Sequence, residues 1–275
     1  MSATQRIHVT ILLIIFITSL PATATIPDGA KAVRVSGGEN HTLVLTADGT
    51  VWGCGDNSQY QLGIGNNENQ ATLAQVLEGD MNTPSDYLED INDIDAGWKH
   101  SLALDVNGFV WAWGNDGWGQ LGNGPNDTSS TPVQVLGGQM GTTYLGNIKG
   151  ISAGRSGEHS LAVDANGFVW AWGRNNKGQL GDNKDSGSYS TTPVKVHDGE
   201  MDTASGYLEN IIAVSAGEEH SMALEKLEPN DPNCNGRVYT WGDNEYYYYI
   251  EYGKGKLGNG KTTDPSIPTA VRVVR

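Results

Sequence analysis

Residues 96–124 read AGWKHSLALDVNGFVWAWGNDGWGQLGNG, and this stretch decides the fold because the chain carries four versions of it. Its histidine recurs as His41, His100, His159 and His220, at separations of 59, 59 and 61 residues. A fixed period of this length is typical of propellers and other arrays, in which each unit buries its faces only by stacking on its neighbours. Each residue of the repeat must therefore be interpreted together with its three counterparts.

Each copy predicts a β-hairpin. Large and small side chains alternate from His100 to Leu104, and an apolar run follows from Phe109 to Trp113. Between them lie Asn107 and Gly108, a pair that supplies the positive backbone dihedrals of a tight turn. The equivalent pairs are Asp48 and Gly49, Asn166 and Gly167, and Asn235 and Gly236. The second strand has no polar face, which predicts a sheet covered by protein on both sides.

Further short strands are predicted on either side of the hairpin. Upstream they cover residues 91–96 and 148–153, and downstream they cover 131–136 and 192–196. We expect Pro132 and Pro193 to open the downstream strands, where no ladder donor is missed. About four short strands per unit is the content of one propeller blade. The sequence therefore predicts an all-β fold, a β-propeller built from four repeats.

The pattern of Gly, His, Ser, Leu, a turn Gly, a Trp-Gly pair and GQLGNG resembles the regulator of chromosome condensation repeat, over residues 33–274. The residues that carry the resemblance are Trp113, Gly114, Gly119, Gln120, Leu121 and Gly122, with Trp172, Gly173, Gly178, Gln179, Leu180 and Gly181. Three positions depart from it: Cys54 replaces the Trp of the first copy, Tyr60 replaces a Gly, and Lys256 replaces a Gln.

The resemblance implies a propeller, usually of seven blades, whereas this chain supplies four. Three outcomes are open: a four-bladed ring, an open arc stabilised by a second chain, or a fragment of a longer protein. An uncovered blade face at the end of an array is unfavourable. We therefore expect closure or self-association.

The predicted organisation is a signal peptide at 1–24, a short linker at 25–32 and the repeat domain at 33–275, with repeats at about 33–90, 91–147, 148–210 and 211–275. A short stretch containing Arg6 precedes an apolar segment that ends in Ala22, Thr23 and Ala24. This segment is shorter than the roughly 20 residues that span a bilayer, so we expect cleavage after Ala24 rather than a retained anchor, and a secreted or extracytoplasmic protein.

Charge and cysteine content narrow the choice of partner. The formal net charge is −15, and no cluster of Lys and Arg is present, so nucleic acid is not expected to bind. No membrane span is expected after signal cleavage. Cys54 falls in a predicted strand and Cys234 in a predicted hairpin tip, which makes them poor partners for a disulfide.

The repeated residues are expected to be structural. Four imidazoles could suggest a metal ring or catalytic bases, but each has the same neighbours in its own blade, so we expect it to hydrogen-bond its own turn. The structural set is His41, His100, His159, His220, Trp113, Trp172, Trp241, Gly114, Gly173, Gly242, Gln120 and Gln179. Residues 231–236 match the opening of a calcium loop, but Gly242 stands where its Glu belongs. No enzyme, metal or cofactor is predicted.

One feature is not repeated. The fourth copy contains an insertion with Tyr246, Tyr247, Tyr248, Tyr249 and Tyr252, and tyrosine buries large area at low entropic cost. These residues are candidates for partner binding, or else they cover a blade edge or mediate self-association. The resulting hypothesis is an exported, non-catalytic propeller that binds a protein partner of unknown identity, or itself, through its loop face.

Two alternatives accompany that hypothesis. One is a structural or surface repeat module of a larger extracellular or envelope protein, with no discrete ligand. The other is a hydrolase built on a propeller. Within the resemblance, one branch contains nuclear exchange factors and chromatin binders, and another contains secreted inhibitors of beta-lactamase. The signal peptide and the acidity argue against the first branch, and the repeats of the second are shorter than these, so neither target is carried over.

Overall fold

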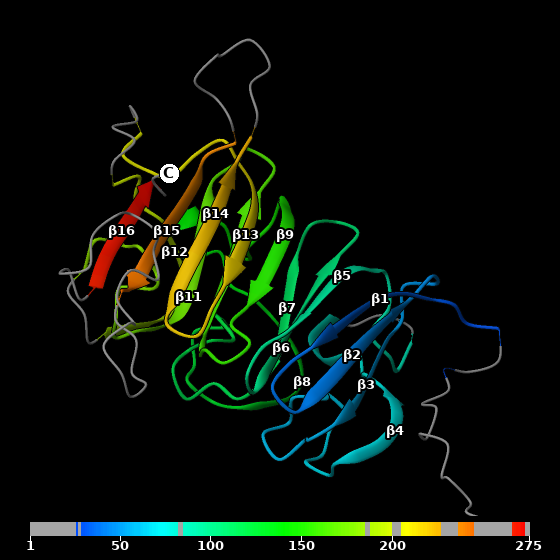
Figure 1. Cartoon of the computed structure of the whole chain (residues 1–275). Helices are drawn as coiled ribbons and strands as arrows, with labels where there is room; N and C mark the ends of the chain where they lie inside the picture. The colour runs from blue at the N-terminus through cyan, green and yellow to red at the C-terminus, as the bar shows by residue number, and fades with distance from the viewer. Residues whose placement is uncertain are drawn as a thin grey trace, which may run out of the picture.

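The computed structural model describes residues 29–81, 85–184, 188–199, 205–226 and 236–244, together with Ile26 and the backbone of 266–272. These residues form four antiparallel sheets of four strands each, and within a sheet each strand pairs with its neighbour in the chain (Figure 1). The first two sheets contain β1 (Ala32–Gly37), β2 (His41–Thr46), β3 (Val51–Gly55), β4 (Gln70–Gln75), β5 (Ile91–Ala96), β6 (His100–Asp105), β7 (Val110–Gly114) and β8 (Ser129–Gln134). The last two contain β9 (Ile148–Ala153), β10 (His159–Asp164), β11 (Val169–Asn175), β12 (Ser188–Lys195), β13 (Ile211–Ala216), β14 (His220–Glu225), β15 (Val238–Asp243) and β16 (Ser266–Arg272).

Tight turns join the two central strands of the first three sheets, as the sequence predicts, while Asn235 of the fourth copy lies outside the described residues. In the second sheet Gly108 has a φ of 84°, and its N–H donates to the Asp105 carbonyl at 3.1 Å. Only the glycine takes a positive φ, so our expectation of positive dihedrals for both turn residues was wrong for Asn107. The Asp105 carboxylate completes the turn by accepting the N–H groups of Asn107 and Phe109 at 2.8 and 3.0 Å. The sequence analysis did not identify Asp105 as part of the turn.

The outer strands β8 and β12 begin earlier than predicted. Pro132 and Pro193 therefore lie inside these strands rather than at their first residues. Both strands are at the edge of their sheets, and the pairing of β7 with β8 shifts register between Ala112 and Gly114. Proline is tolerated because an edge strand with an irregularity does not need every ladder donor.

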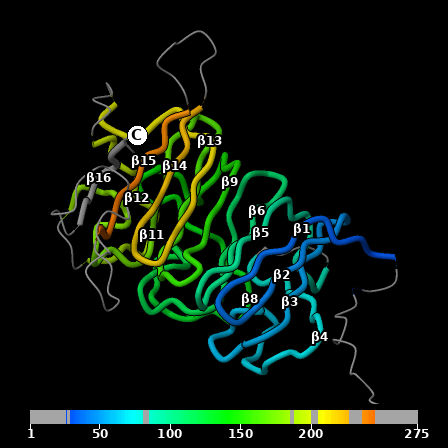
Figure 2. The backbone as a smooth tube through the Cα atoms, in the orientation of Figure 1, coloured from blue at the N-terminus to red at the C-terminus, as the bar shows by residue number. Residues whose placement is uncertain are grey.

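Three apolar cores lie between successive sheets. β2 packs on β5, β6 on β9 and β10 on β13, and each core combines one face of a sheet with the opposing face of the next. The first and fourth sheets lie at opposite ends of this row (Figures 1 and 2). The described blades therefore form a partial propeller, an open arc rather than a closed four-bladed ring, which is one of the outcomes that the sequence left open.

The short 3-10 helices η1 (Gly79–Met81) and η2 (Gly138–Met140) lie in the connections between sheets, and no described helix is long and apolar enough to cross a membrane. Cys54 is a free thiol. Several predictions fall outside the described residues: the signal peptide, Cys234, the calcium-like segment up to Asn235, Lys256 and the tyrosine insertion.

Candidate functional site

Three of the four repeated histidines, His41, His100 and His159, reach across to the next sheet. His41 Nε2 lies 3.0 Å from Ser101 Oγ. The same contact joins His100 to Ser160 at 3.0 Å and His159 to Ser221 at 2.9 Å. We expected each histidine to support its own turn, but backbone groups do this, as in the bond from Gly97 N–H to the His100 carbonyl at 2.9 Å. The imidazoles instead connect neighbouring blades.

One backbone carbonyl completes each connection. Ser101 Oγ donates to the Gln61 carbonyl at 2.7 Å, and Trp113 Nε1 donates to the same oxygen at 2.9 Å. The Gln120 carbonyl accepts from Ser160 and Trp172 at 3.0 and 2.8 Å, and the Gln179 carbonyl accepts from Ser221 and Trp241 at 2.8 Å each. We call this set of His, Gln, Ser and Trp the blade joint. The structure contains three blade joints, one between each pair of successive sheets.

The geometry of the blade joint excludes a nucleophilic role for its serine. A histidine nitrogen 3.0 Å from a serine oxygen could suggest a base and its nucleophile. However, the Ser101 hydroxyl donates its hydrogen to the Gln61 carbonyl, so Ser101 Oγ must accept a hydrogen bond from an N–H at His41 Nε2. The nitrogen that would act as the base therefore carries a hydrogen, and Ser101 is fully buried. The pair is a structural link.

Burial keeps these imidazoles neutral. It lowers the pKa of His41 to about 4 and the pKa values of His100 and His159 to about 3, because the charged form would lose its hydration. The Nδ1 atoms of all three rings are buried without a hydrogen-bond partner. Across the described residues, no group of three or more His, Cys, Asp or Glu side chains could hold a metal ion.

Two glycines of the repeat are required because neighbouring atoms lie too close to leave room for a Cβ. A Cβ on Gly97 would lie 2.5 Å from Cε1 of His100, so glycine makes room for the imidazole. Gly114 has a φ of 102°, and a Cβ there would lie 2.6 Å from the Lys99 carbonyl oxygen. The counterparts of Gly114 are Gly173 and Gly242, which have φ values of 100° and 102°.

A second link joins the first strands of successive sheets. The Ser36 hydroxyl donates to one Asp95 oxygen at 2.7 Å, and the other Asp95 oxygen accepts the Ala153 N–H at 2.9 Å. Ser152 takes the same place in the third sheet and accepts the Ala216 N–H at 3.1 Å. Asp95 thus connects three sheets. The sequence showed the carboxylate but gave no signal of this role.

Asp116 is an unusual member of the repeat. It stands where the first and third copies have Asn57 and Asn175, and it accepts the Leu121 N–H at 2.8 Å, as they do for their own leucines. Both asparagines also donate through their amides, whereas the second Asp116 oxygen is buried without a hydrogen-bond partner. Burial raises the pKa of Asp116 to about 7.

Aromatic and charged side chains lie at the histidine end of the blades, in the loop after β7 and in β11 and β12. Trp118 and Tyr189 make an edge-to-face contact with ring centroids 6.2 Å apart, and they are 36% and 49% exposed. The Arg174 guanidinium lies 5.3 Å from the Trp118 ring and forms ion pairs with Glu158 at 3.3 Å and Glu219 at 3.5 Å. These five residues come from the second, third and fourth sheets, and we call them the loop-face cluster.

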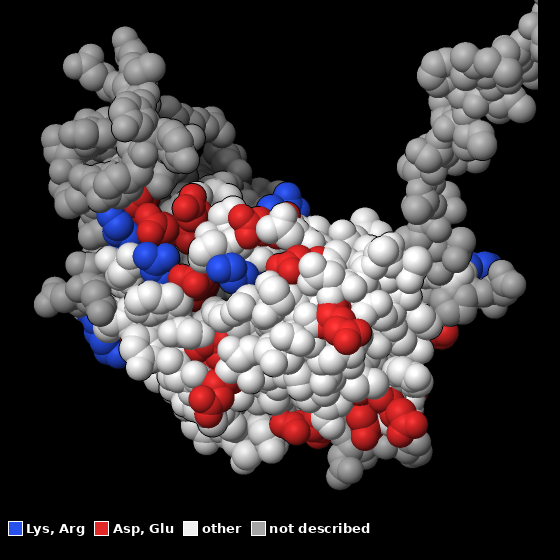
Figure 3. All heavy atoms as spheres, turned by 90° about the horizontal axis from the view of Figure 1, so that it is seen from below, with Lys and Arg blue, Asp and Glu red and all other residues white. Residues whose placement is uncertain are grey.

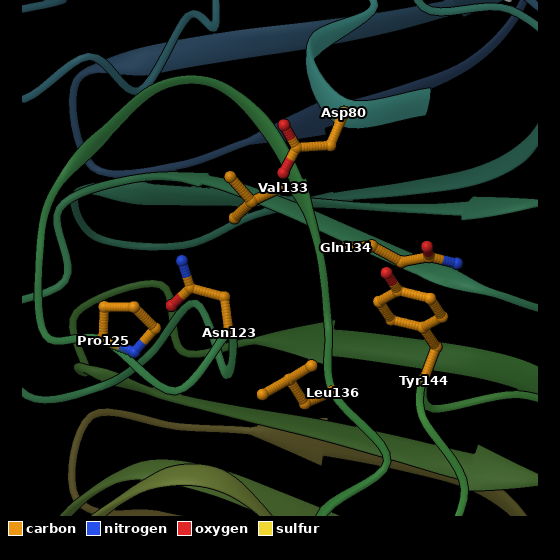
Figure 4. Close-up of a pocket in the computed structure, with 7 residues that line it drawn as sticks. All are labelled: Asp80, Asn123, Pro125, Val133, Gln134, Leu136 and Tyr144. Carbon is orange, nitrogen blue, oxygen red and sulfur yellow. The ribbon is translucent and has the colours of Figure 1, made fainter. Parts of the chain in front are cut away.

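The opposite end of the blades has a shallow pocket of about 310 Å³. Its lining residues are Asp80, Asn123, Pro125, Val133, Gln134, Leu136 and Tyr144 (Figure 4). Asp80 turns its carboxylate toward Val133, and Tyr144 lies across from it. One carboxylate next to amides and aliphatic groups makes neither an acid–base pair nor an activated nucleophile.

Comparison with known proteins agrees with this architecture. The model of the RCC1-like domain matches residues 14–275. The chain is 33% identical over 221 residues to human HERC6, described as a probable E3 ubiquitin-protein ligase, covering 78% of this chain and 18% of that protein. It is 30% identical over 258 residues to pim1 of Schizosaccharomyces pombe, covering 87% of this chain and 41% of that protein.

Solved structures show the same fold. Prp20p of Saccharomyces cerevisiae superposes with a TM-score of 0.66 at 21% identity, over 90% of this chain and 51% of Prp20p. Yeast RCC1 bound to Kap60 gives a TM-score of 0.63 at 23% identity, over 92% of this chain and 50% of that one. The chain thus spans about half of these propellers and less of the curated relatives. On the family match and the repeated blade joints, this chain belongs to the RCC1-like domain family of β-propellers.

Proposed function

We propose that this chain is an exported, non-catalytic propeller that binds another protein through the loop face of its blades. The loop-face cluster carries the proposal. Tryptophan, tyrosine and arginine are the side chains that contribute most to protein interfaces, and here rigid blades position them at one end of the blades. The insertion with the five tyrosines follows Asn244, which comes directly after β15 at the same end.

The relatives support a protein partner. The structural neighbours were studied with protein partners: Prp20p for its binding to Gsp1p and histones, and yeast RCC1 in a complex with Kap60. The ligases among the relatives are much longer than the region matched here, so their activity is not carried over. In Figure 3, acidic side chains are scattered over the face seen from below, and the basic ones are fewer, with most of them toward one side. With a net charge of −15, this distribution argues for a protein partner rather than nucleic acid.

Export rests on the first 24 residues. Amino-terminal sequencing of the protein recovered from culture medium or from an extracytoplasmic fraction should begin at Thr25. Recovery of the full-length chain inside the cell would contradict export, while the binding proposal would still stand.

Binding is tested by chemical crosslinking of the purified protein to the other proteins of the fraction from which it is recovered. Quantitative mass spectrometry should find a partner whose crosslinks fall at the loop-face cluster and are lost in the Trp118→Ala, Tyr189→Ala double variant. Tyr144→Ala is the matched control, because Tyr144 is equally exposed at the other end of the blades. A partner that the double variant retains and the control loses would overturn the choice of face.

A further inference from the structure

The two ends of the arc expose the two halves of a blade interface. The second and third sheets each bury one face against the preceding sheet and the other against the following one. No described sheet precedes the first one, and Val35 in β1 is 67% exposed. Its counterpart in the second sheet, Ile94, is 0% exposed because it packs on the first sheet.

The fourth sheet shows the complementary exposure. Leu224 and Val238 are each 37% exposed, and their counterparts in the second sheet, Leu104 and Val110, are buried against the third sheet. The outer face of the fourth sheet thus has the apolar pattern that receives a following blade. The three internal interfaces show what covers such faces: another blade of the same kind.

We infer that two copies of this chain associate head to tail, with the fourth sheet of each copy packed on the first sheet of the other. Two such contacts are related by a twofold axis and close a ring, so both exposed faces of both copies become covered. One copy matches about half of the yeast propeller, which is the share expected of half a ring. This inference is independent of the loop-face function proposed above.

The contact between copies differs in one respect from the internal blade joints. Cys54 occupies the position of Trp113, so the first sheet lacks the indole that would donate to a carbonyl of the preceding blade. Thr42 keeps a hydroxyl at the position of Ser101, and Trp52 keeps the aromatic ring at the position of Trp111. We therefore expect a contact held mainly by apolar packing, weaker than the three internal ones.

Light scattering coupled to size-exclusion chromatography tests the inference directly. The purified protein should have about twice the mass of one chain. Val35→Asp and Leu224→Asp should each give the mass of one chain, because a buried unpaired carboxylate is unfavourable at either face. Val106→Asp, in the exposed turn between β6 and β7, is the control and should keep the double mass.

Mixing the two variants shows the polarity of the contact. Val35→Asp retains an intact fourth sheet and Leu224→Asp retains an intact first sheet, so an equimolar mixture should recover a species of two chains through one good interface. Circular dichroism must show that both variants remain folded. A single-chain mass for the unsubstituted protein at about 100 µM would overturn the inference. So would disruption by only one of the two substitutions, because a head-to-head contact would use only one face.

Discussion

The first and second sheets are built from the same repeat but differ in what they pack against. Trp113 in the second sheet is fully buried and donates to the Gln61 carbonyl of the preceding sheet, whereas Cys54 at the same position of the first sheet is half-buried. The tryptophan is useful only where a preceding blade supplies a carbonyl. The difference teaches that the signature residues of this repeat stabilise the contact between blades more than the blade itself.

Removing an indole from a blade joint should have the largest effect. Trp172→Ala takes away a fully buried ring and its bond to the Gln120 carbonyl, and should lower the free energy of unfolding by about 3 to 5 kcal/mol. Cys54→Ala, at the same repeat position in the first sheet, should change it by less than about 1 kcal/mol. Urea denaturation followed by tryptophan fluorescence measures both. Equal losses of unfolding free energy in the two variants would contradict the difference between the first sheet and the inner ones.

The serine of a blade joint tests its polar half. Ser160→Ala leaves the His100 N–H buried without an acceptor and should cost about 1 to 3 kcal/mol. Thr42→Ala, the equivalent change in the first sheet, should destabilise the protein less, because Thr42 is half-buried and no described blade precedes its sheet. Thermal unfolding monitored by circular dichroism would report the difference. The proposal of inter-blade links fails if the threonine change is the more harmful one.

Acid should weaken the three blade joints together. His41, His100 and His159 have folded-state pKa values of about 4, 3 and 3, below the ordinary 6.5, so the unfolded chain binds more protons below pH 6.5. Their contribution to stability is complete above pH 6.5 and decreases as the pH falls toward 4, by up to about 1.4 kcal/mol per histidine per pH unit.

Asp116 acts in the opposite direction. Its pKa is raised to about 7, so between about pH 4 and 7 the folded protein holds a proton that the unfolded chain lacks. The net loss from pH 6.5 to 5.5 should be about 2 kcal/mol, measured by urea denaturation at each pH. Asp116→Asn, which restores the residue of the other copies, should make the loss steeper by about 1 kcal/mol. A flat profile over this range would show that the imidazoles are hydrated.

The smallest expected effect concerns the loop of the first sheet. Tyr60 has a φ of 62°, whereas Gly119 and Gly178 occupy the same position of the second and third copies with φ values of 78°. A side chain in this left-handed region costs about 1 kcal/mol, so Tyr60→Gly should stabilise the protein by roughly that amount. Differential scanning calorimetry measures the change. Gly119→Ala should be destabilising, and a stabilising result would show that this position tolerates a side chain.

The sequence by itself determined the repeat unit, and with it the hairpins, the all-β class and the family. These follow from local physics: Gly108 permits the tight turn, and the run from Val110 to Trp113 has no polar face and must be covered on both sides. Only the tertiary structure decided that the blades form an open arc, that His100 pairs with Ser160 rather than with its own turn, and that Asp95 connects three sheets. Each of these features depends on how one blade is placed against the next. The contacts involved join residues about 60 positions apart, so the pattern within a single repeat does not reveal them.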